Sequence, residues 1–164
     1  MDKHHDRGAS QERTILFVCT GNICRSPLAA GIFNQLIGGV SSGSIKAYSA
    51  GIHAVVDAPA DPIVCEIAAA ANIDLSGHRG RQIDVRDFIE FEHVIALDLY
   101  HYDFLIATQP KAATATISLL LNHAKHVRTK EVPDPYGQPR RVFEKSARLI
   151  EEGIRGLLST LSDS

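Results

Sequence analysis

The chain has 164 residues, of which 45% are hydrophobic and 22% charged, so it is long enough for one domain with a proper core and too apolar to be disordered. Seventeen Lys and Arg against nineteen Asp and Glu give a formal net charge of −2, which excludes a strongly basic nucleic-acid-binding protein. Three cysteines favour a reducing compartment over a disulfide scaffold.

The first thirteen residues are polar and mixed in charge, and they predict a flexible N-terminal arm (1–13) ahead of a single domain (14–164). They lack the apolar stretch of a signal peptide. No apolar run approaches the roughly 20 residues that a membrane-spanning helix needs. We therefore expect a cytoplasmic protein without membrane insertion.

Short apolar segments alternate with helical patterns along the rest of the chain. Strands are predicted over 14–19, 45–51, 93–97 and 116–121, and helices over 27–37, 59–72, 84–91, 99–108 and 140–161. Such alternation predicts an α/β domain in which a four-stranded parallel sheet carries helices on both faces. Ligands of such folds bind at the carboxyl ends of the strands, so the loop after the first strand is the first place to look for chemistry.

That loop reads CTGNICRS and runs from the end of a strand into a helix. Free amides at a helix N-terminus bind anions, and their positive field favours the thiolate of Cys19. The guanidinium of Arg25 is a planar fork that matches two phosphate oxygens, and Ser26 can donate a hydrogen bond to the sulfur. The spacing predicts a nucleophile and a clamp around one phosphoryl group, which is bound by Thr20, Gly21, Asn22, Ile23, Cys24 and Arg25.

A candidate general acid lies far along the chain, in the segment VPDPYG. Asp134 stands between two prolines, which stiffen the backbone and hold the carboxylate in place for proton transfer. The neighbouring Tyr136 could stack on an aromatic leaving group. Without the cysteine loop, an ordinary turn aspartate would be the better interpretation of Asp134, and for Tyr136 a half-buried loop aromatic is an equal alternative to stacking.

The segments ILFVCTGNICRSP and VPDPYG together resemble the low-molecular-weight protein tyrosine phosphatases, from Thr14 to the C-terminal helix. The resemblance implies a four-stranded parallel sheet with flanking helices and a phosphate-binding loop after the first strand. We expect no metal ion or other cofactor, because the loop amides and Arg25 already supply the positive field. By motif, Cys19 is the nucleophile, Arg25 the phosphate clamp and Asp134 the acid and then the base. Asn22, Ser26, Ser49 and His78 would support the loop, and Val55 and Tyr136 would form the substrate rim.

Within this family, SAGIHAVVDAPADP and IDLSGHRGRQI look most like the bacterial branch that is paired with exopolysaccharide-associated tyrosine autokinases. The resemblance implies a phosphotyrosine protein as the substrate, with such an autokinase as the candidate partner. Gly137 and Val55 depart from residues found in relatives, which leaves the peptide preference open. The sequence does not give the oligomeric state.

Three alternative functions stay open. An arsenate reductase would need two more cysteines, and only Cys65 remains. Protein-arginine phosphatases carry Thr where this chain has Ile23. A binding module that holds phosphoproteins without turnover is the third.

Two further residues, Cys24 and Asp98, each have two interpretations, and two histidines have one. Cys24 is either a packing residue or a redox partner of the nucleophile, and Asp98 either caps a helix or holds a loop near the site. His123 and His126 are expected to be exposed loop residues, since no ligand partners stand at metal-site spacing.

Overall fold

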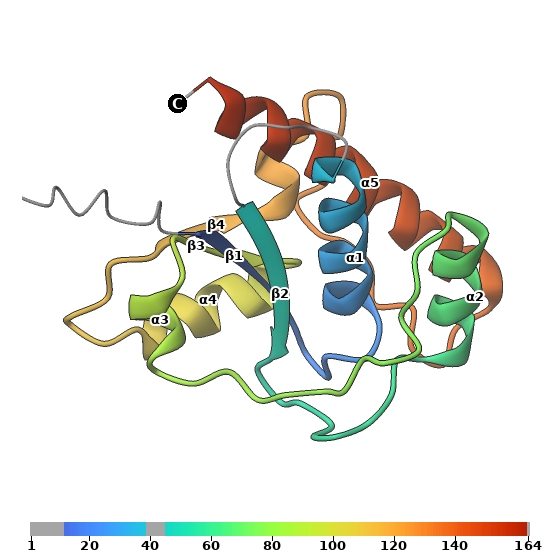
Figure 1. Cartoon of the computed structure of the whole chain (residues 1–164), viewed down its shortest axis with the longest axis horizontal. Coiled ribbons are helices and arrows are strands. Elements are labelled where there is room, and N and C mark those ends of the chain that lie inside the picture. Colours follow the sequence, from blue (N-terminus) through green and yellow to red (C-terminus); the bar gives the residue numbers. More distant parts are fainter. Residues whose placement is uncertain (1–11, 39–44, 164) are drawn as a thin grey trace, which may run out of the picture.

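The computed structural model describes residues 12–38 and 45–163, in which strands and helices alternate as predicted (Figure 1). The elements are β1 (Arg13–Cys19), α1 (Arg25–Ile37), β2 (Ile45–Gly51), α2 (Pro62–Ala70), α3 (Asp87–Glu90), β3 (His93–Ala96), α4 (Leu99–Thr108), β4 (Thr116–Leu119), the 3₁₀ turn η1 (Leu120–Asn122) and α5 (Arg140–Ser162).

The four strands form one parallel sheet in the order β2-β1-β3-β4, which confirms the predicted fold. β1 lies in the interior of the sheet, between β2 and β3. Its register places Cys19 beside Gly51 at the end of β2, and Val18 beside Ala96 at the end of β3. The carboxyl ends of three strands therefore meet where β1 runs into its loop.

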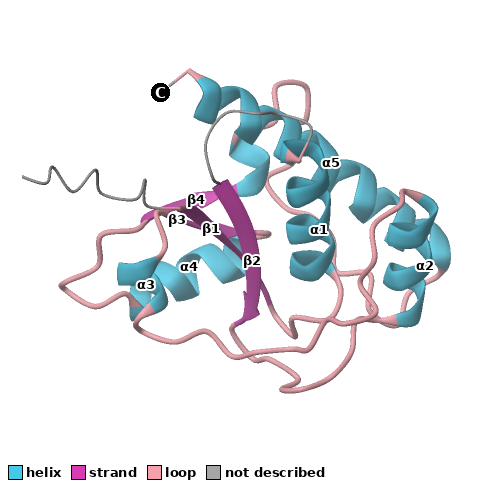
Figure 2. Cartoon of the chain, in the orientation of Figure 1, coloured by secondary structure: helices cyan, strands magenta, loops and turns pink. Residues whose placement is uncertain are grey.

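Helices cover both faces of the sheet (Figures 1 and 2). On one face, Ile15 and Phe17 pack with α1, α2 and α5, and the ring of Phe17 lies 6.0 Å from that of Phe33. On the other face, Leu16 and Val18 pack with α3 and α4. The neighbouring strands β1 and β3 thus lead into helices on opposite faces, so the loops that follow them diverge and leave a crevice at the carboxyl edge.

Several element ends differ from the predicted ones. α1 begins at Arg25, two residues before Pro27. The helix accepts a proline in its first turn, because the amide that proline lacks would have no partner within the helix there. α2 begins at Pro62 and not at residue 59, since the carboxylate of Asp61 accepts from the amide of Ile63 and caps the helix there. The last two residues of the predicted fourth strand turn into η1.

The predicted N-terminal arm falls almost entirely outside the described residues, which begin at Glu12. Arg13 already belongs to β1, and its guanidinium lies 2.8 Å from the carboxylate of Glu92. The domain boundary after residue 13 stays a prediction. In the described ranges, no helix is both long enough and apolar enough to cross a membrane.

Candidate active site

The loop between β1 and α1 turns its carbonyl groups outward. These oxygens accept hydrogen bonds from the amides of the segment after β2: Thr20 from His53 (3.0 Å), Gly21 from Val55 (3.0 Å) and Ile23 from Asp61 (2.9 Å). In a trans peptide the next N–H points the opposite way, so the amides of residues 21, 22 and 24 face the interior of the loop. None of them donates to another residue in the described part of the chain. The loop therefore presents a concave set of free donors, which is an anion-binding arrangement.

Asn22 holds the loop in this shape. It is fully buried and has a left-handed backbone (φ 58°), a conformation that Asn adopts more readily than most residues. Its side chain donates to Ser26 Oγ (2.9 Å) and accepts from the amide of Arg81 (2.8 Å). Its carbonyl lies 2.7 Å from Nε2 of His78, which donates the hydrogen bond. Gly51 backs the loop so closely that a Cβ there would lie 2.5 Å from the carbonyl oxygen of Thr20.

Ser26 connects this support to the sulfur of Cys19. The two atoms Sγ and Oγ lie 2.9 Å apart, and Cys19 is almost completely buried. Because Ser26 Oγ already accepts from Asn22, its own proton is free to be donated to the sulfur; the carbonyl of Ala50, at 3.3 Å, is the more distant acceptor.

Ser49 is the one predicted supporting residue that does not contact the loop. It lies on β2 opposite Phe17, it is half-buried, and its hydroxyl makes no hydrogen bond within the described residues. It lines a separate, more open groove between α1 and the segment around His78, which contains neither Cys19 nor Arg25.

The guanidinium of Arg25 is buried and held on one side. Nη1 donates to Asp98 (2.8 Å) and to the carbonyl of Val132 (3.0 Å). Nη2 lies 3.5 Å from Thr20 Oγ1 and 3.7 Å from the carboxylate of Asp134. Nε has no protein partner among the described residues. The fork is thus fixed in place while one of its donors stays available.

A cavity of about 250 Å³ unites the predicted catalytic residues. Cys19 and Arg25 lie at its base and Asp134 beside them, and the side chains of Val55 and Tyr136 (50% and 63% exposed) also line it. The whole lining is Cys19, Thr20, Gly21, Ile23, Cys24, Arg25, His53, Val55, Asp134 and Tyr136. His53 was not predicted; its ring packs edge-on against Phe104 at 5.8 Å.

Asp134 is carried by an anchored loop. Its carboxylate accepts from the amide of Tyr136 (3.1 Å), so the segment turns back on itself. The amide of Val132 donates to Leu97 at the end of β3 (3.0 Å), and Ser146 of α5 donates to the carbonyl of Pro133 (2.7 Å). The stiffness that the two prolines predict is therefore reinforced from both sides.

All three cysteines are free thiols. Cys24 lines the cavity but is only 5% exposed, and burial, with Asp61 nearby, raises its pKa to about 12. Cys65 is half-buried on α2 and its pKa is also raised, mainly by burial.

The described residues contain no group of three or more His, Cys, Asp or Glu side chains placed to hold a metal ion. His126 is exposed as expected, but the prediction for His123 was wrong. His123 is half-buried and its Nε2 lies 3.1 Å from Ser118 Oγ, because the chain folds back over β4 after η1.

Asp98 was predicted in two alternative roles, and His101 was not predicted. Asp98 does both things considered for it: it caps α4 by accepting from the amide of His101 (2.9 Å), and it binds Arg25. His101 lies behind the loop, with Nε2 at 2.8 Å from Thr20 Oγ1. The signal for both residues was an aspartate at a strand's carboxyl end, followed three positions later by a histidine in the first helical turn.

Known proteins with similar sequences are phosphatases of low molecular weight. Residues 14–164 match the family described as low molecular weight phosphotyrosine protein phosphatase. The chain is 31% identical over 149 residues to the low molecular weight protein-tyrosine-phosphatase Etp of Escherichia coli K12, covering 91% of this chain and 95% of Etp.

Two solved structures are also similar. The crystal structure of YfkJ from Bacillus subtilis superposes with a TM-score of 0.86 at 34% identity, covering 95% of this chain and 98% of that one. That of the Drosophila arginine phosphatase DARP superposes with a TM-score of 0.83 at 25% identity, covering 90% and 96%. With a family match over nearly the whole chain, this protein belongs to the low molecular weight phosphotyrosine protein phosphatases.

Proposed function

We propose that this protein hydrolyses phosphotyrosine in proteins through a phosphocysteine intermediate. The observation that carries the proposal is the single cavity of about 250 Å³ in which Cys19, Arg25 and Asp134 meet above a loop of free amides. Membership of the phosphatase family supports the same chemistry.

In the first step, the Cys19 thiolate attacks the phosphorus of the substrate. The S–P bond forms and the P–O bond to the tyrosine ring breaks, while Asp134 gives its proton to the leaving phenolate oxygen. Arg25 and the loop amides bind the equatorial phosphoryl oxygens, where negative charge is spread in the transition state. The 3.7 Å contact between Arg25 and Asp134 keeps the acid beside the clamp.

In the second step, water attacks the phosphocysteine. Asp134, now a carboxylate, takes a proton from the water, the P–O bond forms, and the S–P bond breaks to release inorganic phosphate and the thiolate. The hydroxyl of Ser26, 2.9 Å from the sulfur, stabilises the departing thiolate by donating to it. Neither step requires a metal ion or another cofactor, because the amides and Arg25 supply the positive field.

The depth of the cavity favours an aryl phosphate. Cys19 is only 2% exposed, so a phosphoryl group has to enter on a long, flat stem to reach its sulfur. Phosphotyrosine provides such a stem and phosphoserine does not. Val55 and Tyr136 line the cavity beside the entering ring, and we propose that they contact it.

Phosphoarginine is the second candidate substrate, because DARP shares the fold. Ile23 lines the cavity with a branched apolar side chain, which suits an aromatic ring and offers no hydrogen bond to a guanidinium. We therefore place phosphotyrosine first. The protein partner that we propose is a tyrosine autokinase of the exopolysaccharide type in the cytoplasm, which rests on the sequence resemblance alone.

Phosphate release from matched phosphotyrosine, phosphoserine and phosphoarginine peptides, with EDTA present, tests this function. We expect fast release from the phosphotyrosine peptide only, and none from Cys19→Ser. The Ile23→Thr variant should shift the preference toward phosphoarginine while release still depends on Cys19. A wild-type protein that prefers phosphoarginine would promote the second candidate, and loss of activity in EDTA would contradict the metal-free mechanism.

A further inference from the structure

His101 is a fully buried histidine with two polar contacts, both to residues that touch Arg25. It lies in the first turn of α4 with no exposed surface. Its Nε2 atom lies 2.8 Å from Thr20 Oγ1, and its Nδ1 atom lies 3.0 Å from the carboxylate of Asp98. The geometry of the Nδ1 contact is not that of a hydrogen bond, so Nδ1 and the Asp98 carboxylate interact only electrostatically.

These contacts and the burial of the ring determine the charge and the tautomer of the His101 imidazole. Burial lowers the pKa of His101 to about 4, and the nearby Arg25 adds to this effect while Asp98 and Asp134 oppose it. The imidazole is therefore neutral at neutral pH and carries one proton. That proton belongs on Nδ1, because an Nδ1 lone pair 3.0 Å from a carboxylate oxygen would be repelled by it. Nε2 then accepts the hydrogen bond from the hydroxyl of Thr20.

With this tautomer, four side chains close a ring of contacts around the clamp. Thr20 donates to His101, which leaves the lone pairs of Thr20 Oγ1 free for Nη2 of Arg25 at 3.5 Å. His101 lies against one oxygen of Asp98, and the other oxygen accepts from Nη1 of Arg25 at 2.8 Å. The two terminal nitrogens of the guanidinium, Nη1 and Nη2, thus each contact a residue that His101 also contacts.

We propose that His101 is a positioning residue, which fixes the guanidinium of Arg25 for phosphoryl binding through Thr20 and Asp98. His101 does not line the cavity, so it acts only through these two neighbours. A change at His101 should therefore weaken the binding of any tetrahedral oxyanion, and it should do so whatever the leaving group. The expected loss of kcat/KM rests on the proposed function, whereas the expected loss of oxyanion affinity rests only on the anion-binding arrangement of the loop after β1.

The test compares His101→Ala, His101→Gln and Thr20→Val. Tungstate is the probe, with its dissociation constant measured by calorimetry, and kcat and KM are measured with p-nitrophenyl phosphate and phenyl phosphate. We expect His101→Ala to weaken tungstate binding and to lower kcat/KM for both esters by about tenfold, the scale of one buried hydrogen bond. The amide oxygen of His101→Gln can reach the former Nε2 position and accept from Thr20, so most of the loss should be recovered.

Thr20→Val removes the hydroxyl from a half-buried residue and keeps the side-chain shape, so it remains informative if His101→Ala folds poorly. We expect a loss like that of His101→Ala, and no further loss in the double variant, because both changes break one connected set of contacts. Additive losses would overturn the proposal. So would unchanged tungstate affinity in either single variant, or a Gln variant no better than the Ala variant.

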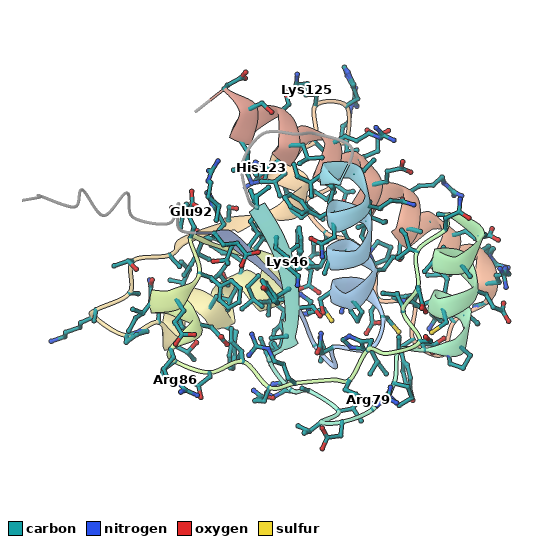
Figure 3. All side chains as sticks on the ribbon, viewed as in Figure 1. Lys46, Arg79, Arg86, Glu92, His123 and Lys125 are labelled. Carbon is teal, nitrogen blue, oxygen red and sulfur yellow. The ribbon has the colours of Figure 1, made fainter. Side chains whose placement is uncertain are left out.

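His123→Ala is the matched control. It too removes a histidine that meets a hydroxyl, at 3.1 Å from Ser118, but His123 does not line the cavity, and in the view of Figure 3 it lies toward the end of the molecule opposite Arg79. We expect wild-type tungstate affinity in this variant, and a loss as large as that of His101→Ala would refute a specific role. A wild-type protein that binds tungstate but releases no phosphate from phosphotyrosine would contradict the proposed function, while the binding comparisons would still decide the role of His101.

Discussion

At the scale of single residues, the groups proposed to carry out catalysis differ sharply in exposure. The side chain of Arg25 is 3% exposed and Cys19 is 2% exposed, whereas the Asp134 carboxylate is 55% exposed. In the proposed mechanism, binding and attack therefore take place on a buried base, and proton transfer takes place at the mouth of the cavity. Each group can be changed with a distinct kinetic result.

Removing the carboxylate in Asp134→Ala should depend on the leaving group. A poor leaving oxygen such as that of tyrosine needs the proton, and general acid catalysis is typically worth about 10²–10⁴-fold. We expect a loss in that range for a phosphotyrosine peptide and a much smaller loss for p-nitrophenyl phosphate. Measuring kcat for a series of aryl phosphates of graded leaving-group basicity checks this. Equal losses across the series would make Asp134 a structural residue.

Cys24 lines the cavity, but its high pKa predicts a chemically quiet thiol. With a pKa of about 12 and 5% exposure, it holds almost no thiolate at pH 7, and the thiolate is the reactive form. Brief treatment with iodoacetamide at pH 7 should therefore modify Cys19 and leave Cys24 intact, as read by peptide mass spectrometry. Inorganic phosphate should protect Cys19. Modification of Cys24 at a similar rate would contradict its raised pKa.

The sequence could supply Cys19, Arg25 and Asp134, because two of them share one short motif and the third is framed by prolines. It offered Asp98 only as one of two alternatives, and it did not reveal the contacts that orient Arg25. Asp98 lies 73 positions from Arg25, and the carbonyl of Val132 lies 107 positions away. No local pattern encodes such contacts, since they depend on how the sheet brings separate strand ends together.

At the scale of elements, α5 covers the sheet face on which α1 and α2 also pack. This helix spans 23 residues and packs on α1, α2 and η1. Its approach to η1 is close enough to require glycine: a Cβ at Gly156 would lie 1.9 Å from the carbonyl oxygen of His123, which is backbone and has little freedom to shift. The contact therefore tolerates no larger residue without movement of the helix.

Gly156→Ala should destabilise the fold by about 1–3 kcal/mol, the usual cost of overpacking a tight contact. The matched control is Gly77→Ala, where a Cβ would meet nothing within 4 Å. We expect a clear fall in Tm for the first variant and none beyond a degree or two for the second. Urea unfolding of both proteins measures the difference. If both variants melt with the wild type, α5 does not lie as close to η1 as the structure has it.

Element positions were predictable where periodicity is strong, as for β1, β2 and the amphipathic α5. The errors fell at ends, and local chemistry explains them. Asp61 caps α2 later than its alanine-rich pattern suggests, and the apolar run of β4 continues into η1, because both segments are buried and burial alone does not separate strand from turn.

At the scale of the whole molecule, the order β2-β1-β3-β4 places the site. β1 provides the anion loop, β3 is followed by Asp98 and supports Val132, and α1 and α4 leave the sheet on opposite faces. The buried polar groups of the site are thereby enclosed between two helical layers. Their ionisation is then tied to the stability of the entire fold.

His101 makes this coupling measurable. Its pKa is about 4 in the folded protein and near 6.5 when unfolded, so between these values the unfolded chain binds a proton that the folded chain does not. Stability should fall as the pH drops from 6.5 to 4, by about 3 kcal/mol at most. Asp98 and Asp134, which face the ring and favour its charge, reduce this loss, and Arg25 increases it.

Urea unfolding of the wild type and of His101→Gln at pH 7, 6, 5 and 4.5 tests the coupling. The variant cannot titrate at this position, so its stability should change less over this range. Burial also lowers the pKa of His123, so His123→Gln is the fitting comparison and should flatten the profile to a smaller extent. The carboxylates with lowered pKa values, Asp74, Asp84 and Glu92, lose their contribution to stability from the low-pH end of this range downward, and they should do so alike in all three proteins. Parallel profiles for wild type and His101→Gln would show that folding leaves the pKa of His101 unchanged, so that the ring is protonated in the folded protein below pH 6.5 and cannot accept from Thr20 there.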